Sequence, residues 1–448
     1  MALTIKQTPS TIDTGSGYTR YVPNGAYTNL MYVLSSSNAT QPQFRYVTTI
    51  KSGSQDLTTI KTYPNQTNNG IIDVAPVLQS YMGSDEVHKT AGYALPVNTN
   101  KLFNFDFGEE YGTSISSSTT IYTGSATDQL RLIPARVYKN ENSYNFDYGK
   151  YIQTASGYLT NDPGVDSLTL LPNGPNGVML NGDDYMTVTL FSDEFGISPP
   201  TADFWITIRP GKWENGVLTL VPWQRLEISG SVDPTNPYCV TFGMGPQNLI
   251  NFSNNFSASY AAGDINWYYS SADQGSFNVI INDKWDGVQT GKNQNPDQHA
   301  FSIQPCPVDE YTRFSWINEY GFWDYYNVYN PLKKTLQVDR STYHKPFVRY
   351  NETLSSYNAS NRGLTQYDTD YTEKFSIQTE YITRPYANWL TEMFESSDVR
   401  IQETKNGNTF FTPINILNTS VQWQLSDNRE KLFQYTIEFK YANDLQSR

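Results

Sequence analysis

The sequence is poor in the residues that build reactive or metal-binding centres. Its 448 residues include only 2 Cys and 3 His. His88, His299 and His344 lie far apart along the chain and lack the spacing of zinc ligands. Cys239 and Cys306 could pair, but a secreted disulfide scaffold carries more cysteines, so we favour two reduced thiols. We therefore predict no zinc site and no cofactor.

Charged residues and long apolar runs are also scarce. Lys and Arg total 31 against 44 Asp and Glu, which gives a formal net charge of −13. This negative field repels phosphate backbones and no basic block offsets it, so we expect no nucleic-acid binding. No apolar run approaches the roughly 20 residues that cross a bilayer, and the first ten residues show no signal peptide. We expect a soluble chain, made in the cytoplasm and not inserted in a membrane.

Catalytic motifs are equally scarce. The sequence contains no GxSxG, P-loop, GxGxxG or HExxH pattern. Residues 271–275 resemble the Asp turn of sialidase propellers, but Phe277 is misplaced for the motif and no second copy exists. Residues 282–287 lack the spacing and the distal Glu of a calcium loop, which favours a tight turn. His344 is interpreted as a surface residue at the end of a strand.

A glycosidase needs only two carboxylates, and sequence spacing does not test for such a pair. With 44 acidic residues in the chain, no particular pair is favoured. We predict no catalytic, cofactor-binding or metal-binding residues, and no enzymatic activity.

Aromatic residues are abundant, with 34 Tyr and 22 Phe in the chain. They are densest over residues 311–340, where Phe314 and Trp316 alternate with polar side chains at the period of a half-buried strand. A turn over 318–321 leads to a second strand over 322–329, and residues 335–339 alternate again. We predict a meander of three antiparallel strands. Its rings are expected to form a sheet core; a carbohydrate-stacking surface and a protein interface are the alternatives.

The pattern along the chain predicts three domains, over residues 1–130, 131–300 and 301–448. The first is a β domain whose residues 1–19 form a flexible arm that orders on a neighbour. Asp73 is predicted to cap a short closing helix with Pro76 in its first turn. Strands are expected over residues 27–34, 44–50, 56–63 and 102–107, the last with Phe103, Phe105 and Phe107 on one side.

The second and third domains follow the same strand-rich pattern. Short strands are expected over 186–191, 204–209, 217–221 and 226–229, with a polar insertion over 248–297. In the third domain, Thr383 is predicted to cap a helix that buries Trp389, Leu390, Met393 and Phe394. Residues 375–381 and 433–441 alternate as strands, and residues 405–408 predict a hairpin. The fold class is mainly β: a multi-domain antiparallel β-sandwich or barrel protein with a few short helices.

Three parts of the sequence carry a family resemblance: FRYVTTIK with NNGIIDVAPVLQSYM, RFSWINEYGFWDYYNVYNPLKKTLQVDRSTY, and NWLTEMFESSDVRI with DNREKLFQYTIEFKYAND. Together they resemble virion structural proteins of tailed phages that infect Bacteroidota, including crAss-like phages and related marine phages. The resemblance implies a virion protein similar to tail, neck and baseplate components that assemble in rings. It supplies no active-site residues.

The favoured hypothesis is a non-enzymatic, multi-copy tail, collar or baseplate protein whose partners are copies of itself and neighbouring virion proteins. The alternative is a fibre or head-decoration protein that binds host surface glycan. Its stacking platforms would use rings such as those of Trp267, Tyr268, Tyr269, Trp285, Trp323 and Tyr325. A polysaccharide depolymerase is disfavoured because the sequence has no β-helix repeat.

Overall fold

The structure is a computed structural model of the 448-residue chain, and it is mainly β, as predicted, with several antiparallel sheets and short helices. It describes residues 3–9, 11–13, 20–22, 24–27, 29–85, 93–94, 98–136, 178–181, 184–191, 204–214, 217–220, 224–228, 239–243, 245, 247–248, 275–282, 298–303, 310–345, 348–351, 354–357, 363–406, 408–418 and 432–443.

The chain divides into two compact units. Unit 1 is Met1–Val308, Ser315–Tyr326 and Glu395–Ser397, and unit 2 is Asp309–Phe314, Asn327–Phe394 and Asp398–Arg448. The predicted domain boundary between residues 130 and 131 falls inside strand β11 (Thr120–Ile133). The division into three domains stays a prediction.

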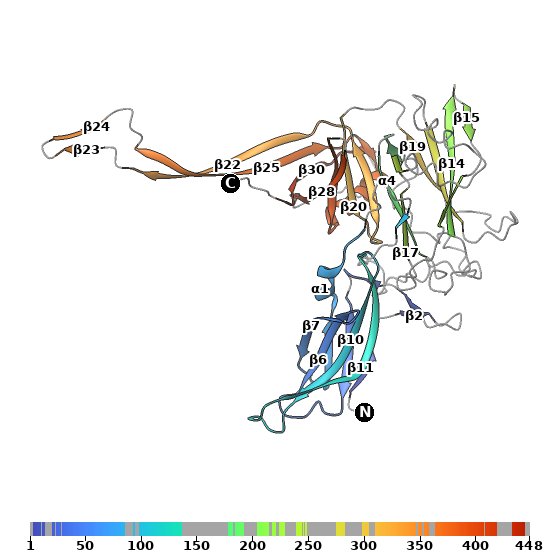
Figure 1. Ribbon diagram of the computed structural model, residues 1–448, viewed down its shortest axis with the longest axis vertical. Coiled ribbons are helices and arrows are strands. Elements are labelled where there is room, and N and C mark those ends of the chain that lie inside the picture. The colour runs from blue at the N-terminus through green and yellow to red at the C-terminus, as the bar shows by residue number, and fades with distance from the viewer. Residues whose placement is uncertain are drawn as a thin grey trace. The chain divides into compact units, whose positions relative to one another are not determined.

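The N-terminal part of unit 1 contains two sheets (Figure 1). In the smaller sheet, β5 (Met31–Ser36) lies between β1 (Leu3–Gln7) and β8 (Asn69–Asp73). The larger sheet has the order β4 (Asn24–Gly25), β11, β10 (Lys101–Tyr111), β6 (Arg45–Ser52) and β7 (Gln55–Thr62). The predicted strands over 44–50, 56–63 and 102–107 are therefore confirmed.

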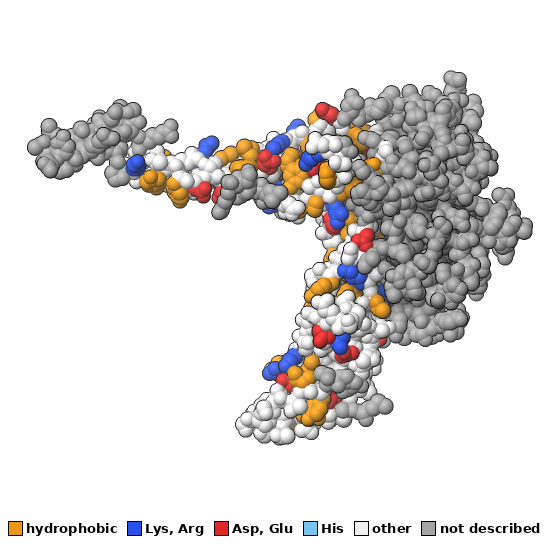
Figure 2. Space-filling view, in the orientation of Figure 1, with side chains coloured by type: hydrophobic (Ala, Val, Ile, Leu, Met, Phe, Trp, Pro, Cys, Tyr) orange, Lys and Arg blue, Asp and Glu red, His pale blue; other side chains and the backbone are white. Residues whose placement is uncertain are grey.

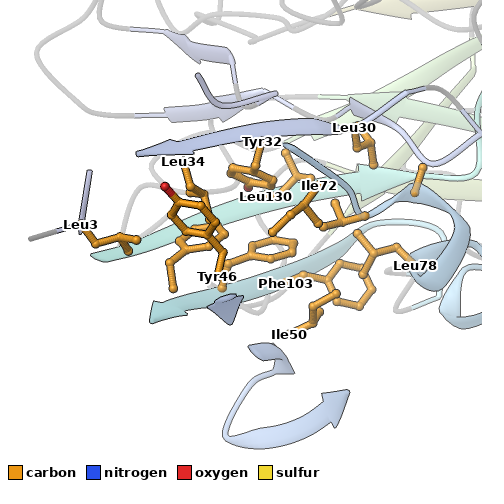
Figure 3. Close-up of a cluster of buried hydrophobic side chains, with 14 of the residues drawn as sticks. Leu3, Leu30, Tyr32, Leu34, Tyr46, Ile50, Ile72, Leu78, Phe103 and Leu130 are labelled. Carbon is orange, nitrogen blue, oxygen red and sulfur yellow. The ribbon is translucent and has the colours of Figure 1, made fainter. Parts of the chain in front are cut away.

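Side chains from both sheets form one hydrophobic cluster (Figure 3). Phe103, Phe105 and Phe107 are fully buried on one side of β10, as the alternation predicts. The ring of Tyr32, from the smaller sheet, lies 5.2 Å from that of Phe105 and 5.0 Å from that of Phe107. Tilted aromatic contacts of this kind add to the stabilisation that burial provides.

The predicted N-terminal arm is wrong for residues Leu3–Gln7. These residues form β1 and pair with β5 of the same chain. Leu3 is buried in the cluster, because the alternating residues of β1 can place one apolar side chain on the core face. Residues 14–19 lie outside the described part of the chain.

The short helix α1 (Ala75–Leu78) is present with Pro76 in its first turn, but Asp73 is not its N-cap. The N-cap is Val74, which makes no side-chain capping bond. The Asp73 carboxylate instead accepts hydrogen bonds from the backbone N–H groups of Ala75, at 3.0 Å, and Leu30, at 3.1 Å. Asp73 therefore joins the end of β8 to the helix and to the segment before β5.

The remaining strands of unit 1 confirm the predicted short strands of the central region. One sheet contains β12 (Val178–Leu180), β19 (Gln298–Ile303), β18 (Gly275–Asn282), β14 (Phe204–Glu214) and β15 (Val217–Leu220), and β16 (Gln224–Ile228) pairs with β14. Another contains β13 (Thr187–Phe191), β17 (Cys239–Gly243) and β9 (Tyr93–Ala94). Strand β18 comes from the predicted polar insertion, yet it lies inside its sheet between β14 and β19. Two short strands, β2 (Thr11–Asp13) and β3 (Arg20–Val22), pair with each other.

A seven-stranded sheet contains most of the described strands after residue 310. Its order is β21 (Trp323–Val328), β20 (Thr312–Ile317), β27 (Val399–Lys405), β28 (Asn408–Ile416), β30 (Thr436–Tyr441), β25 (Leu364–Gln378) and β22 (Lys333–His344). Strands β20 and β21 are buried along their whole length, so the expectation of a half-buried strand is wrong.

The predicted three-stranded meander is also wrong, because β22 does not follow β21 in the sheet. These two strands occupy opposite ends of the strand order, although only residues 329–332 connect them. Within unit 2, the rings of Phe314 in β20 and Phe439 in β30 contact each other at 5.7 Å, although β27 and β28 separate these strands in the strand order.

The turn between β20 and β21 is confirmed. Gly321 has a φ of +91°, where a side chain would be strained, and its N–H donates to the Asn318 carbonyl at 3.1 Å. The predicted hairpin over 405–408 joins β27 to β28, with Asn406 at a φ of +54°. Residues 421–425, which also alternate, lie outside the described part.

Helix α4 (Arg384–Glu395) buries Trp389, Leu390 and Met393, as predicted, and leaves Phe394 half-buried. The strand before it, β26 (Ile382–Thr383), pairs with β29 (Leu432–Phe433). Phe433 therefore belongs to a separate strand and not to β30. The alternation over 375–381 places Tyr381 on the same side as Phe375 and Ile377, but β25 ends at Gln378 and Tyr381 is 70% exposed.

Substitution of Trp323, with Tyr381 for comparison, tests whether the Trp323 ring belongs to the core or to an exposed stacking surface. Trp323 is 2% exposed and Tyr381 is 70% exposed. We expect Trp323→Ala to lower the free energy of unfolding by about 3–5 kcal/mol, because a large buried ring leaves a cavity. Tyr381→Ala is the control and should change it by less than about 0.5 kcal/mol. Urea unfolding followed by circular dichroism measures both; an unchanged Trp323→Ala variant would contradict a core role.

Candidate functional site

Strands β22 and β25 extend beyond the seven-stranded sheet as a two-stranded ribbon (Figure 1). Strand β25 pairs with β30 only over its last residues, Phe375 to Gln378, whereas it pairs with β22 from Leu364 to Ser376. Nearly every side chain of β22 is exposed. We call β22 together with residues 364–376 of β25 the ribbon.

A chain of aromatic contacts holds the ribbon at its base. The Phe375 ring stacks on that of Phe439 at 5.3 Å and meets that of Tyr441 edge-on at 5.1 Å. Phe439 in turn contacts Phe314 of β20. The Lys334 ammonium of β22 lies 5.8 Å from the centre of the Phe375 ring. Strand β25 is therefore part of the core at one end and exposed at the other.

The ribbon has two different faces, since directly opposed residues of antiparallel strands share a face. Face A carries the apolar side chains, and face B carries only polar ones. Face A comprises Lys334, Leu336, Val338, Arg340, Thr369, Tyr371, Glu373 and Phe375. Face B comprises Lys333, Thr335, Gln337, Asp339, Ser341, Asp368, Asp370, Thr372, Lys374 and Ser376. Apolar and charged side chains are visible along this segment in Figure 2.

The middle of face A carries apolar side chains that are exposed in the isolated chain. Leu336 is 53% exposed and Tyr371 is 37% exposed. Lys334 and Glu373 form an ion pair at 2.6 Å on the same face. Exposed apolar side chains gathered on one face and rimmed by polar ones can mark a contact surface.

Face B has an unfavourable arrangement of charge. Asp339 lies directly opposite Asp370, and Asp368 follows two residues further along β25 on the same face. Like charges in directly opposed positions destabilise a strand pair. Among the described residues, neither Asp339 nor Asp370 has an ion-pair partner, so nothing in that part of the chain offsets this repulsion.

Exposed rings lie at the outer end of the ribbon. A register shift between Ser341 and Thr342 leaves Tyr367 as an additional residue in β25. Tyr367 is 68% exposed, and its ring meets that of Tyr343 edge-on at 5.9 Å. Two further strands, β23 (Val348–Asn351) and β24 (Leu354–Tyr357), pair with each other between β22 and β25 in the chain.

Glu403, a carboxylate of unit 2, has a clearly perturbed pKa. Its Oε1 accepts a hydrogen bond from the Tyr441 hydroxyl at 2.6 Å. Its Oε2 accepts from the Thr412 hydroxyl at 2.7 Å and from the Lys405 ammonium at 3.0 Å. Burial alone would raise the pKa of Glu403, but these three donors outweigh it and lower the pKa below its usual range. The carboxylate ties β27, β28 and β30 together.

This network is structural in character. A carboxylate whose hydrogen-bond donors lower its pKa is a weak proton acceptor, so Glu403 is poorly suited to general acid–base chemistry. Burial, and then the Glu403 carboxylate, raise the pKa of the Tyr441 hydroxyl, which keeps it protonated as a donor. In the described residues no three His, Cys, Asp or Glu side chains gather as metal ligands, and no helix could span a membrane.

Two of the aromatic rings named as possible glycan-stacking platforms are buried. Trp323 and Tyr325 are 2% and 3% exposed, and the Tyr325 hydroxyl shares a hydrogen bond of 2.9 Å with Thr187. They belong to the core and not to a stacking surface. Trp267, Tyr268, Tyr269 and Trp285 lie outside the described residues. His344 is exposed at the end of β22, as predicted.

Sequence reasoning missed the ribbon itself. A signal for it was present, because residues 364–374 contain few apolar residues and neither Gly nor Pro. A strand with few apolar residues has little to bury in its own chain. No protein-family model matches the sequence, and no curated protein matches it at a significant level.

Glu403 gives a pH-dependent prediction. Because its pKa is lowered in the folded state, its contribution to stability is present above the unfolded-state pKa of about 4.3 and is lost as the pH falls through the folded value. We expect Glu403→Gln to destabilise the protein by about 1–2 kcal/mol at pH 7. The difference from the parent chain should shrink below about pH 4.

The control is Glu438→Gln, which changes an exposed glutamate of β30 and should have little effect at either pH. Urea unfolding at pH 7 and at low pH measures both variants. A destabilisation of Glu403→Gln that stays constant with pH would contradict a role for the ionised carboxylate.

Proposed function

We propose that this protein is a non-enzymatic structural component of a tailed-phage virion, present in multiple copies in the tail, collar or baseplate. The observation that carries the proposal is the ribbon, a paired segment with exposed side chains on both faces and an apolar patch on one. The class of particle rests on the resemblance of the three sequence segments to phage virion proteins.

The ribbon favours assembly for a physical reason. A two-stranded hairpin is marginally stable in water on its own, because it buries too little surface. The ribbon pairs twelve residues of β22 with β25, and in the described chain no third strand covers its outer part. Contact with another subunit would bury face A and supply the missing stabilisation. Structural proteins commonly join through strand pairing and extended surfaces of this kind.

The non-enzymatic part of the proposal has its own support. The perturbed carboxylate of unit 2, Glu403, is saturated by three donors from its own sheet. That arrangement stabilises a fold and leaves little capacity to move a proton on a substrate. Recombinant protein is expected to release no sugar from host polysaccharide.

The alternative function, binding of host surface glycan, has one observation in its favour. Tyr343 and Tyr367 present exposed rings on the outer ribbon, where a sugar could stack. A glycan array with the parent chain and with a Tyr343→Ala/Tyr367→Ala variant tests this. Binding that the double variant loses would favour the fibre or decoration hypothesis.

Shortening the ribbon tests the proposed function directly. Leu336 and Glu373 are paired, so residues 337–372 can be replaced by Asn-Gly, which favours a two-residue hairpin turn. We expect the melting temperature to change by less than about 3 °C, since the removed residues of β22 and β25 are largely exposed. Phage particles produced with the ribbon-shortened variant as the sole source of this protein should fail to incorporate it.

The matched control replaces Lys345–Gly363 with Asn-Gly. This variant keeps β22 and β25 in full and removes only the segment between them. Mass spectrometry of purified particles and a reconstruction of the virion measure incorporation. The proposal fails if the parent chain is absent from particles, or if the ribbon-shortened chain is incorporated at the parent level.

A further inference from the structure

The outer edge of β22 is an unpaired sheet edge with an unusual order of charges. Strand β22 ends the strand order of its sheet, and within the described chain it pairs only with β25. Its peptide groups on the other side can therefore pair with an added strand. Lys333 and Asp339 lie six residues apart on face B, and neither has an ion-pair partner among the described residues.

This order of charges makes the edge complementary to itself. If two β22 strands pair in antiparallel fashion about a twofold axis through Leu336, Lys333 of each copy lies opposite Asp339 of the other. Thr335 then opposes Gln337, and Leu336 opposes its own counterpart on face A. Each Asp339, which faces Asp370 within its own chain, gains a cation on its other side.

Neighbouring registers lack this complementarity. An axis through Gln337 places Lys334 opposite Arg340, and an axis through Asp339 places that carboxylate opposite itself. An axis through Val338 forms no pair of opposite charges. Directly opposed like charges are unfavourable, so charge selects the register centred on Leu336.

We propose that β22 pairs edge to edge with β22 of a second copy of this chain, in the antiparallel register centred on Leu336. The inference names one partner for the ribbon and so rests on the proposed function. An edge of seven residues is short, and we expect a weak reversible dimer in solution. Inside a particle, other contacts would raise the effective concentration of the two edges.

The ordinary alternative is that these charges protect the edge. Charged side chains on an edge strand commonly prevent unwanted pairing. In that case each charge acts alone and the sequence order is irrelevant. The two interpretations predict opposite results when the charges are exchanged.

Exchanging the charges of Lys333 and Asp339 in the full chain, singly and together, distinguishes edge pairing from edge protection. Sedimentation velocity over a wide range of protein concentrations measures the dimer. Lys333→Asp and Asp339→Lys should each weaken the dimer by about tenfold or more, because each turns two attractive pairs into two repulsive ones. The double variant Lys333→Asp/Asp339→Lys should recover the dimer. Lys374→Asp is the matched control, because it makes the same charge change on face B of the other strand.

An effect of these substitutions on folding can be distinguished from an effect on the dimer. Asp339→Lys replaces the repulsion with Asp370 by an attraction inside the chain, so its melting temperature should not fall while its dimer weakens. A loss of dimer together with an unchanged or raised melting temperature supports edge pairing. A parent chain that stays monomeric, a double variant that does not recover, or an equal effect of Lys374→Asp overturns it.

Cross-linking tests the register independently. In a chain with Cys239→Ser and Cys306→Ser, Leu336→Cys should form a disulfide-linked dimer under mild oxidation, because the two residues face each other at the axis. Val338→Cys is the control, since its two copies would lie about 13 Å apart along the strands. Equal cross-linking of both variants overturns the register.

The two proposals can fail separately. A monomeric chain that is nevertheless found in purified particles overturns the edge pairing and leaves the proposed function in place. A chain that dimerises through β22 but is absent from particles supports the pairing and refutes the virion role.

Discussion

The contact between Phe375 and Phe439 is the interaction on which the functional interpretation depends. It fixes the inner end of β25 in the seven-stranded sheet, where Phe439 also contacts Phe314. The outer residues of the same strand pair only with β22 in the described chain. One strand thus connects a packed core to an exposed ribbon, and the stability of the core holds the ribbon in place.

Polar interactions reinforce this base. Tyr441 meets Phe375 with its ring and donates its hydroxyl to Glu403, which also accepts from Thr412 and Lys405. A carboxylate with three donors is well stabilised although it is partly buried, because its charge is matched by hydrogen bonds. Tyr441 therefore contributes both to apolar packing and to the stabilisation of a charge at the base of the ribbon. This division of labour suits a structural protein, whose surface elements must be held by a firm core.

The contrast between the two ends of the ribbon is the reason why we propose it as an interaction surface. Near the base, apolar rings are covered by their own chain. Further out, Leu336 and Tyr371 are exposed, and Asp339 faces Asp370. Both features raise the free energy of the isolated ribbon, and both would be relieved by a partner that covers apolar area or brings a cation. Assembly is therefore the function that these features support best.

The amino-acid sequence alone determined the strand-rich class, the burial of Phe103, Phe105 and Phe107, and the turns at Gly321 and Asn406. Local alternation and turn chemistry fix these features, and neither depends on distant partners. Only the tertiary structure decided that β22 pairs with β25 and not with β21, that Leu3 belongs to the core, and that β20 and β21 are buried on both faces. Strand order and double-sided burial arise from contacts between residues far apart in the chain, and period-two patterning carries no information about which strand becomes the neighbour.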